Sequence, residues 1–260
     1  MENPFQPQEI RSPAWARYYQ RHGTSFARSA APRIRSFYEA TRGAHADRSL
    51  LDVCCGQGTL AMHFAEHGYR VTGIDLSEPQ LAIAEENLRE HLKDGRVRLV
   101  RADAARFSVD DRFGLATSTF DSLNMLRSLA ALTSCFACVR QVLADDGMFV
   151  FDLMTRRGFW QDYNTVVVSD TEEELYVLKS VFDGVDKAAT RMTGFVRSRD
   201  GHWERFEELR SATLFPAPVV ISTLKDAGWS RVWVAAIDDL TTSIADPEEF
   251  DRVWFVAINA

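Results

Sequence analysis

Two glycines and an aspartate are the residues whose types and spacing point most directly to chemistry. The segment Leu50–Ala61 reads as a buried strand that ends in the turn Gly56-Gln57-Gly58 and continues into a helix. A second apolar stretch then stops at Asp75. In a doubly wound sheet, the amides of such a turn face a ligand and the carboxylate accepts hydrogen bonds from ribose hydroxyls. The spacing predicts a site for an adenosine-containing cofactor, and the alternative is a packing turn followed by a helix-capping aspartate.

A nicotinamide dinucleotide is a competing ligand for the same turn. Its fingerprint is G-x-G-x-x-G, with a third glycine for close packing of helix and strand. The chain has Gly56 and Gly58 but Ala61 at the third position, and an acidic residue, Asp52, already precedes the turn. The match to a pyrophosphate loop is poor, so a nicotinamide-dependent oxidoreductase is kept only as an alternative function.

Four segments carry a family resemblance. They are, in order, Asp52-Val53-Cys54-Cys55-Gly56-Gln57-Gly58, Gly73-Ile74-Asp75-Leu76-Ser77, Arg101-Ala102-Asp103-Ala104 and Phe120-Asp121-Ser122-Leu123-Asn124. This series resembles the successive motifs of class I S-adenosylmethionine-dependent methyltransferases of the small-molecule type, such as glycine and nucleotide-sugar N-methyltransferases. The resemblance implies S-adenosyl-L-methionine as cofactor, S-adenosyl-L-homocysteine as product, and methyl transfer to a nitrogen or oxygen of a small molecule, with nitrogen preferred. An S-adenosylmethionine-binding protein that does not methylate is the alternative.

The resemblance also implies which residues bind the cofactor. The glycine turn would face its methionine and ribose portions, Asp75 would bind the ribose, and Leu76 would pack on the adenine. Asp103 would accept a hydrogen bond from the exocyclic amine of adenine, although an aspartate after a strand is also a common helix cap. The implied set is Tyr18, Asp52, Cys54, Gly56, Gly58, Asp75, Leu76, Asp103, Ala104 and Phe120.

Two positions depart from the family pattern. The family usually has glycine where Cys54 stands, and a small residue can replace it where the backbone angle is ordinary. The fourth strand usually begins with Phe-Asp, whereas Phe113 is followed here by Gly114. The first departure predicts a slightly altered loop, and the second leaves the geometry of that strand edge open.

The catalytic candidates follow the fourth strand. Asp121 and Asn124 could orient an acceptor amine or hydroxyl, and Asp121 could act as a general base or cap the helix that starts near Ser122. In similar proteins an aromatic or basic side chain from N-terminal helices reaches the methionine carboxylate. Trp15, Tyr18 and Tyr19 are candidates for that role here, or they simply pack the helix against the domain.

These residues need a scaffold of alternating strands and helices. Apolar periodicity predicts an α/β fold: a Rossmann-like, doubly wound, seven-stranded sheet whose last two strands form an antiparallel hairpin. A capping box, Ser77 with Gln80, begins the helix that follows Asp75. The predicted strands are 49–54, 70–75, 96–102, 114–119, 147–153, 231–237 and 252–258, and the main helices are 58–67, 125–143 and 216–228.

Between residues 165 and 214 the rhythm changes to strand-like stretches with turn signals at Asp183-Gly184 and Asp200-Gly201. This predicts an inserted antiparallel meander whose arginines could meet an anionic acceptor or, for most of them, simply lie on a solvated face. The predicted organisation is a helical cap at 1–44, a cofactor-binding core at 45–155 and 216–260, and an inserted β subdomain at 156–215.

Composition limits the classes of partner. The net charge of -7 and the lack of a long charged block give no electrostatic footprint for nucleic acid. No apolar run reaches the roughly 18 residues that span a bilayer, and no signal-peptide pattern precedes the first helix. We therefore expect a cytoplasmic monomer or homodimer that acts on a small molecule, with no nucleic acid or membrane partner.

The four cysteines predict no metal centre. Cys135 and Cys138 form a C-x-x-C pair, but no second pair and no matching histidines accompany them. They lie within a helical pattern in which positions three apart share a face. We expect buried, reduced cysteines there.

Overall fold

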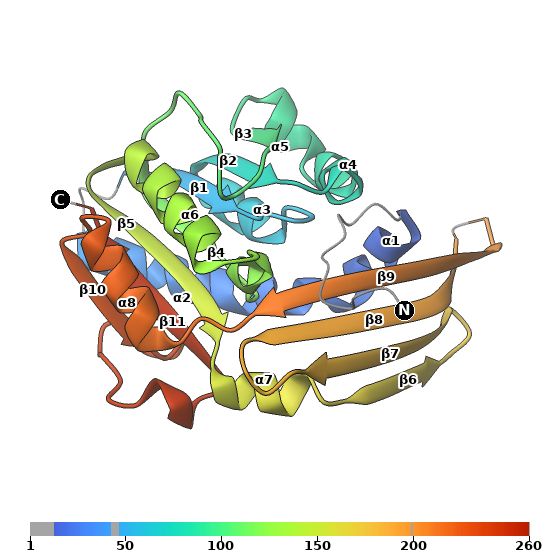
Figure 1. Cartoon of the computed structure of the whole chain (residues 1–260). Helices are drawn as coiled ribbons and strands as arrows, with labels where there is room; N and C mark the ends of the chain where they lie inside the picture. Colours follow the sequence, from blue (N-terminus) through green and yellow to red (C-terminus); the bar gives the residue numbers. More distant parts are fainter. Residues whose placement is uncertain (1–12, 43–46, 199, 260) are drawn as a thin grey trace.

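The computed structural model describes residues 13–42, 47–198 and 200–259, and a seven-stranded sheet forms its centre (Figure 1). The strand order is β10-β11-β5-β4-β1-β2-β3, with β1 to β5 parallel and β11 antiparallel to both β5 and β10. This confirms the predicted fold and its closing hairpin. The strands are β1 (Ser49–Val53), β2 (Arg70–Asp75), β3 (Val97–Arg101), β4 (Phe113–Ser118), β5 (Leu143–Met154), β10 (Arg231–Ala235) and β11 (Arg252–Ile258).

Helices cover both faces of this sheet because neighbouring strand residues point to opposite sides. Leu50 packs in the apolar cluster formed with α2 (Thr24–Arg42) and α3 (Thr59–Glu66). Leu51, the next residue, packs in the cluster formed with α6 (Leu129–Val142) and α8 (Ala217–Asp226). Figure 1 shows α6 and α8 on one side of the sheet and α2 on the other. Burial on both faces explains why these strands read as continuous apolar runs.

Some predicted helices differ in their limits. The helix after Ser77 is divided at Leu88 into α4 (Glu78–Asn87) and α5 (Arg89–Lys93), and the Ser77 hydroxyl accepts the predicted capping bond from the backbone of Gln80. The helix predicted from residue 125 begins only at 129. A 3-10 turn, η2 (Ser122–Met125), precedes it. The Ser128 side chain then caps α6 by accepting a hydrogen bond from the backbone of Ala131.

Gly114 allows a close approach at the start of β4. A Cβ built at this position would lie 2.3 Å from the Tyr38 hydroxyl and 2.7 Å from Cβ of Asp47. The backbone amide of Gly114 donates to the Ser49 hydroxyl. The absence of the usual aspartate therefore coincides with α2 lying tightly against the strand, and β4 still begins at Phe113.

The inserted segment forms a second sheet, with α7 (Arg156–Asp162) before it. It is an antiparallel meander, as predicted, with four strands, and the short run of valines after α7 forms its edge strand. The strands are β6 (Val166–Asp170), β7 (Glu174–Phe182), β8 (Lys187–Arg197) and β9 (Trp203–Thr213). A last 3-10 turn, η3 (Pro247–Glu249), precedes β11.

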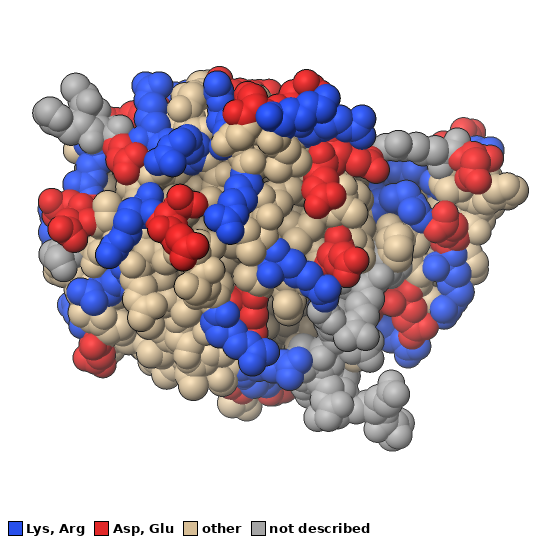
Figure 2. Space-filling view, turned by 90° about the horizontal axis from the view of Figure 1, so that it is seen from above, with Lys and Arg blue, Asp and Glu red and all other residues tan. Residues whose placement is uncertain are grey.

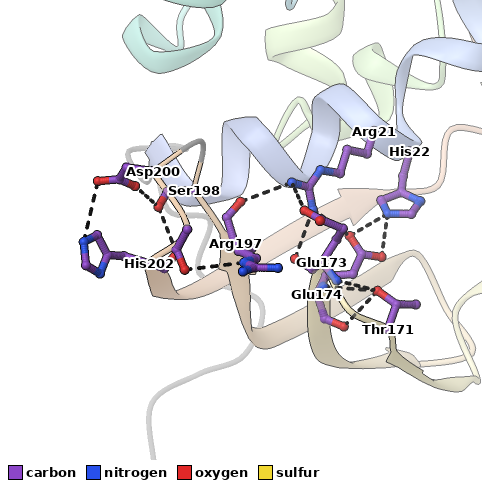
Figure 3. A network of polar contacts seen from close by, with 10 residues as sticks. Arg21, His22, Thr171, Glu173, Glu174, Arg197, Ser198, Asp200 and His202 are labelled. Atoms are coloured by element: carbon purple, nitrogen blue, oxygen red, sulfur yellow. Dashed lines mark hydrogen bonds and ion pairs between the residues drawn. The ribbon is translucent and has the colours of Figure 1, made fainter.

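Helix α1 (Pro13–His22) connects the inserted sheet to the core. At one end, the His22 ring lies 2.7 Å from the buried carboxylate of Glu174, and Arg21 donates to the backbone oxygens of Glu173 and Arg197 (Figure 3). On its other side, the Gln57 side chain donates to the backbone oxygen of Ala16 at 2.6 Å. The helix is thus bonded both to the meander and to the glycine turn.

The molecular surface carries both signs of charge. In the view of Figure 2, Lys and Arg side chains are intermixed with Asp and Glu side chains over the visible face. Within the described ranges, no helix combines the length and the apolar character that crossing a membrane requires.

Candidate functional site

The turn after β1 leaves open space at its centre. Gly56 has φ +53°, and a Cβ built on it would meet nothing within 4 Å. Gly58, with φ +74°, precedes α3, and a Cβ there would lie 2.4 Å from Cδ1 of Leu88. Gly58 therefore allows Leu88 to pack closely against the turn, whereas Gly56 borders space that a ligand can occupy.

Cys54 begins this turn in an unexpected conformation. Its φ is +60°, so the condition for an easy replacement of glycine, an ordinary backbone angle, is not met. The left-handed region costs a residue with a Cβ about 1–2 kcal/mol, and the usual glycine of the family avoids that cost. The side chain is largely buried, and burial raises the pKa of the thiol well above its ordinary value. Cys54 therefore shapes the loop as an uncharged small side chain.

Asp75 lies beside the open space. Its two carboxylate oxygens accept hydrogen bonds from the backbone amides of Gly56 and Ser77, each at 2.8 Å. Burial raises the pKa of this carboxyl, while these backbone bonds act in the opposite direction. Each oxygen keeps a second acceptor position, as binding to ribose hydroxyls requires. Leu76 is 47% exposed beside it, available to pack on a planar ring.

Asp52 lies beneath the turn. It is buried, and the Thr117 hydroxyl donates to one of its oxygens at 3.2 Å. Burial raises the pKa of Asp52 to about 7, against the opposing effect of the hydrogen bond from Thr117. From this position Asp52 can support the glycine turn that follows β1.

Asp103 and Ala104 follow β3. One Asp103 oxygen accepts a hydrogen bond from the Ala105 backbone at 2.9 Å, and the other pairs with Arg106 at 3.1 Å. Ala104 is buried against the apolar cluster that contains α6. Asp103 thus organises the turn that a planar base would approach, which is the capping role considered from the sequence, and a contact with adenine stays a prediction.

The turn after β4 has an unusual backbone that a buried carboxylate holds. Phe120 and Asp121 both have positive φ, +65° and +48°. Their amides donate to the two oxygens of Asp152 on β5, at 2.7 and 2.8 Å. Arg252, from β11, pairs with Asp121 at 2.7 Å and also with Asp152. Sequence reasoning missed Asp152 and Arg252, although an aspartate inside the apolar run of β5 was a usable signal.

The charges of Asp121, Asp152 and Arg252, a buried trio, determine how the Asp121 side chain is held. Burial raises the pKa of Asp152, and Arg252 opposes that effect. Burial also disfavours the charge on Arg252, but the two carboxylates outweigh it and raise the pKa of the guanidinium. The Asp121 side chain makes no capping bond to η2. It is held instead by a permanent cation at the carboxyl edge of the sheet.

Asn124 lies fully inside the protein. Its amide nitrogen donates to the backbone oxygen of Thr213 at 2.8 Å, and its oxygen accepts from the backbone of Met154 at 3.0 Å. These bonds connect η2 to both β5 and β9. The fully buried side chain therefore positions the edge of the site, and a direct contact with an acceptor stays a prediction.

The two tyrosines of α1 point in different directions. Tyr18 packs on Tyr176 of the inserted sheet, with ring centroids 4.9 Å apart. Tyr19 lies 6.3 Å from the Phe120 ring. Burial raises the pKa of Tyr19 to about 12, and the nearby charges of Asp121 and Asp75 act in the same direction. Tyr19 therefore lies toward the turn after β4 as a neutral hydroxyl, and the role of Tyr18 at the cofactor stays a prediction.

A cavity of about 430 Å³ lies between the second turn and the inserted sheet. This is within the usual range for small-molecule sites. Asp121 and Arg252 line it from the core, and Leu178, Met192 and Arg210 line it from the meander. Elsewhere in the described ranges, no three His, Cys, Asp or Glu side chains are grouped as a metal site requires.

Known proteins share both sequence and fold with this chain. The methyltransferase domain family matches residues 50–147. A putative methyltransferase of Geobacillus sp. (strain WCH70) is 27% identical over 246 residues, which cover 94% of this chain and 91% of that protein. The putative methyltransferase YqeM of Bacillus subtilis is 26% identical over 211 residues, covering 80% and 83% of the two chains.

Solved structures match the whole architecture. An S-adenosylmethionine-dependent methyltransferase from Clostridium acetobutylicum superposes with a TM-score of 0.79 at 20% identity, covering 95% of this chain and 98% of that chain. The sugar N-methyltransferase KedS8 from a Streptoalloteichus species superposes with a TM-score of 0.73 at 23% identity, covering 94% and 92%.

Fold, glycine turn and relatives together define a class I S-adenosylmethionine-dependent methyltransferase. Residues 50–147 match the methyltransferase domain family, and S-adenosyl-L-methionine is the cofactor that such enzymes use. Both alternatives raised from the sequence, a cofactor-binding protein that does not methylate and a nicotinamide-dependent oxidoreductase, give way to this conclusion. The open space at Gly56, the carboxylate of Asp75 and the exposed Leu76 fit such a cofactor.

Proposed function

We propose that the enzyme methylates a nitrogen, or secondarily an oxygen, of a small molecule that binds in the cavity beside Asp121. The observation that carries this proposal is the arrangement of two turns on neighbouring strands. The turn after β1 has space for the cofactor, and the turn after β4 borders the 430 Å³ cavity. A methyl group presented at the first turn is then close to an acceptor held at the second.

The cofactor-binding residues are part of the same proposal. Gly56 gives access to the backbone, Asp75 binds the ribose hydroxyls, and Leu76 packs on the adenine. Asp103 with Ala104 forms the far wall, and Tyr19 closes the site from α1. Asp52, Cys54 and Gly58 set the shape of the loop, while Tyr18 acts indirectly by fixing α1 to the meander.

The preference for nitrogen rests on the electrostatics of Asp121. When bound, the cofactor supplies a methyl group on a sulfonium, which is already a good leaving group. Asp121 is paired with Arg252, which holds its carboxylate at the edge of the cavity, where it can accept a hydrogen bond from a neutral acceptor amine and orient the lone pair of that amine. An amine can react mainly by positioning, whereas a hydroxyl needs a general base to remove its proton. Among the structural neighbours, KedS8 is a sugar N-methyltransferase, and another, from Micromonospora echinaspora, is an amino pentose methyltransferase.

The proposal also includes the expectations about domain organisation, location, oligomeric state and partners. We keep the division into a helical cap at 1–44, a core at 45–155 and 216–260, and an inserted subdomain at 156–215. We also keep a cytoplasmic location, a monomeric or homodimeric state, and the absence of nucleic acid and membrane partners.

Product analysis tests the proposal. The purified enzyme is incubated with S-adenosylmethionine and matched panels of small amines and small alcohols, and both S-adenosylhomocysteine and the product masses are measured. We expect products heavier by one methyl group from the amine panel, and a kcat about tenfold lower for Asp121→Asn with unchanged cofactor affinity. Methylation of the alcohols alone would contradict the preference for nitrogen, and methylation in neither panel would contradict the proposed acceptor class.

A further inference from the structure

The cavity beside Asp121 contains the guanidinium of Arg210, for which the described residues provide no ion-pair partner. We propose that Arg210 binds an anionic group of the acceptor, a carboxylate or a phosphate, on the side of the cavity formed by the inserted sheet. This inference rests on the proposed function, because it assumes that the acceptor occupies this cavity. It makes Arg210 a specificity-determining residue of the enzyme.

Arg210 lies on the face of β9 that lines the cavity. Its guanidinium carbon is 5.6 Å from the centroid of the Trp15 ring, and Nη2 lies 3.2 Å from the sulfur of Met125. These contacts hold the guanidinium plane in place. A thioether is only a weak acceptor, so most of the five N–H groups of the arginine stay available for a ligand.

Within the described part of the chain, Arg210 lacks the acidic partner that Arg191 and Arg205 of the same sheet have. Arg191 and Arg205, on the outer face, both pair with Glu207. Among the described residues, no carboxylate lies at ion-pair distance from Arg210, and its Nε is buried without a hydrogen-bond partner. Burying an unpaired polar group is costly. Because the planar fork of arginine matches carboxylate and phosphate oxygens, an anion entering the cavity would satisfy these donors.

The core side of the cavity carries negative charge. Asp121 and Asp152 contribute two carboxylates against the single cation of Arg252, and Asp162 also lines the cavity. On the side of the inserted sheet, Arg210 is accompanied by Glu208, a buried carboxylate two residues away on β9. The cavity therefore has Asp121 on one side and the Arg210 guanidinium on the other, and it fits a molecule that presents an amine to Asp121 and an anion to Arg210.

Calorimetry with small probes tests this without turnover. Glycine, O-phosphoethanolamine and ethanolamine are titrated into the enzyme saturated with S-adenosylhomocysteine. We expect at least one anionic probe to bind about tenfold or more tightly than ethanolamine, because each paired charge adds to the binding free energy. Comparison of glycine with O-phosphoethanolamine distinguishes a carboxylate from a phosphate.

Variants assign the preference to Arg210. Arg210→Met should abolish it and Arg210→Lys should keep part of it, while Arg205→Met, on the outer face of the same strand, should leave it intact. Equal binding of all probes, no binding of either anionic probe, or a preference that survives in Arg210→Met would overturn the inference. Titration of S-adenosylhomocysteine alone separates the two proposals: wild-type enzyme that binds it and methylates uncharged amines keeps the proposed function and loses only the role of Arg210.

Discussion

Two neighbouring turns at the carboxyl edge of the sheet reach left-handed backbone conformations by different means. The turn after β1 uses Gly56 and Gly58, and at Gly56 the missing side chain leaves open space. The turn after β4 uses Phe120 and Asp121, which keep their side chains. Such conformations cost non-glycine residues about 1–2 kcal/mol each, so the second turn needs support from elsewhere.

That support comes from a buried carboxylate. Asp152 accepts both amides of the second turn, and Arg252 balances its charge and holds Asp121. In the proposed function, the first turn is a backbone surface for the cofactor, and the second turn presents side chains to the acceptor.

Removing Arg252 should give the largest expected effect, a loss of free energy of unfolding. Arg252→Met leaves Asp121 and Asp152 without their counter-charge, and loss of one member of a buried ion pair lowers the free energy of unfolding by about 3–5 kcal/mol. Urea denaturation at pH 7 measures this. Burial raises the pKa of Asp152 above the unfolded value, so the protonated form favours the fold and stability is lost as pH rises. The deficit should consequently be smaller at pH 5 than at pH 7.

The matched control is an exposed ion pair whose acidic member, Asp251, directly precedes Arg252 in the sequence. Arg157 bonds Asp251 at 2.9 Å with both side chains about half exposed. Arg157→Met should lower the free energy of unfolding by less than about 1 kcal/mol. If Arg252→Met costs no more than this control, the buried trio does not support the second turn.

Alanine substitutions at Gly56 and Gly58 distinguish a glycine that borders a ligand site from one that allows close packing inside the protein. Gly58→Ala should lose about 1–2 kcal/mol from its backbone angle and a further 1–3 kcal/mol from the contact with Leu88. Gly56→Ala should lose only the first amount, but its methyl group should weaken S-adenosylhomocysteine binding by about tenfold or more, which corresponds to 1.4 kcal/mol. Denaturation and calorimetry measure the two effects. Unchanged ligand affinity in Gly56→Ala would show that the open space does not face the cofactor.

The sequence predicted the features that depend on local pattern. Alternating apolar runs indicated the seven strands, and the pair Gly56 and Asp75 indicated the first turn, because the strand, the turn and the next strand are close in sequence. The capping bond of Ser77 was also predicted, since it needs only the residue three positions later.

The second turn depends on residues that are distant in sequence. Asp152 and Arg252 follow Asp121 by 31 and 131 positions, and only the pairing of β11 with β5 brings them together. Dependence on residues distant in sequence also explains why the sequence could not distinguish Tyr18 from Tyr19 as the tyrosine nearer the cofactor. Helical spacing places both near the domain, but their directions depend on where the inserted sheet packs against α1.

The most direct test of the central claim is calorimetric titration of S-adenosylmethionine and S-adenosylhomocysteine into the wild-type enzyme and Asp75→Ala, with NADH as control. We predict micromolar binding of both sulfur ligands, no binding of NADH, and a loss of about 2 kcal/mol or more in Asp75→Ala, because the ribose hydroxyls lose a charged acceptor. Arg252→Met, where it stays folded, should retain most of this affinity. Equal affinity in wild type and Asp75→Ala would contradict the assignment of the first turn as the cofactor site.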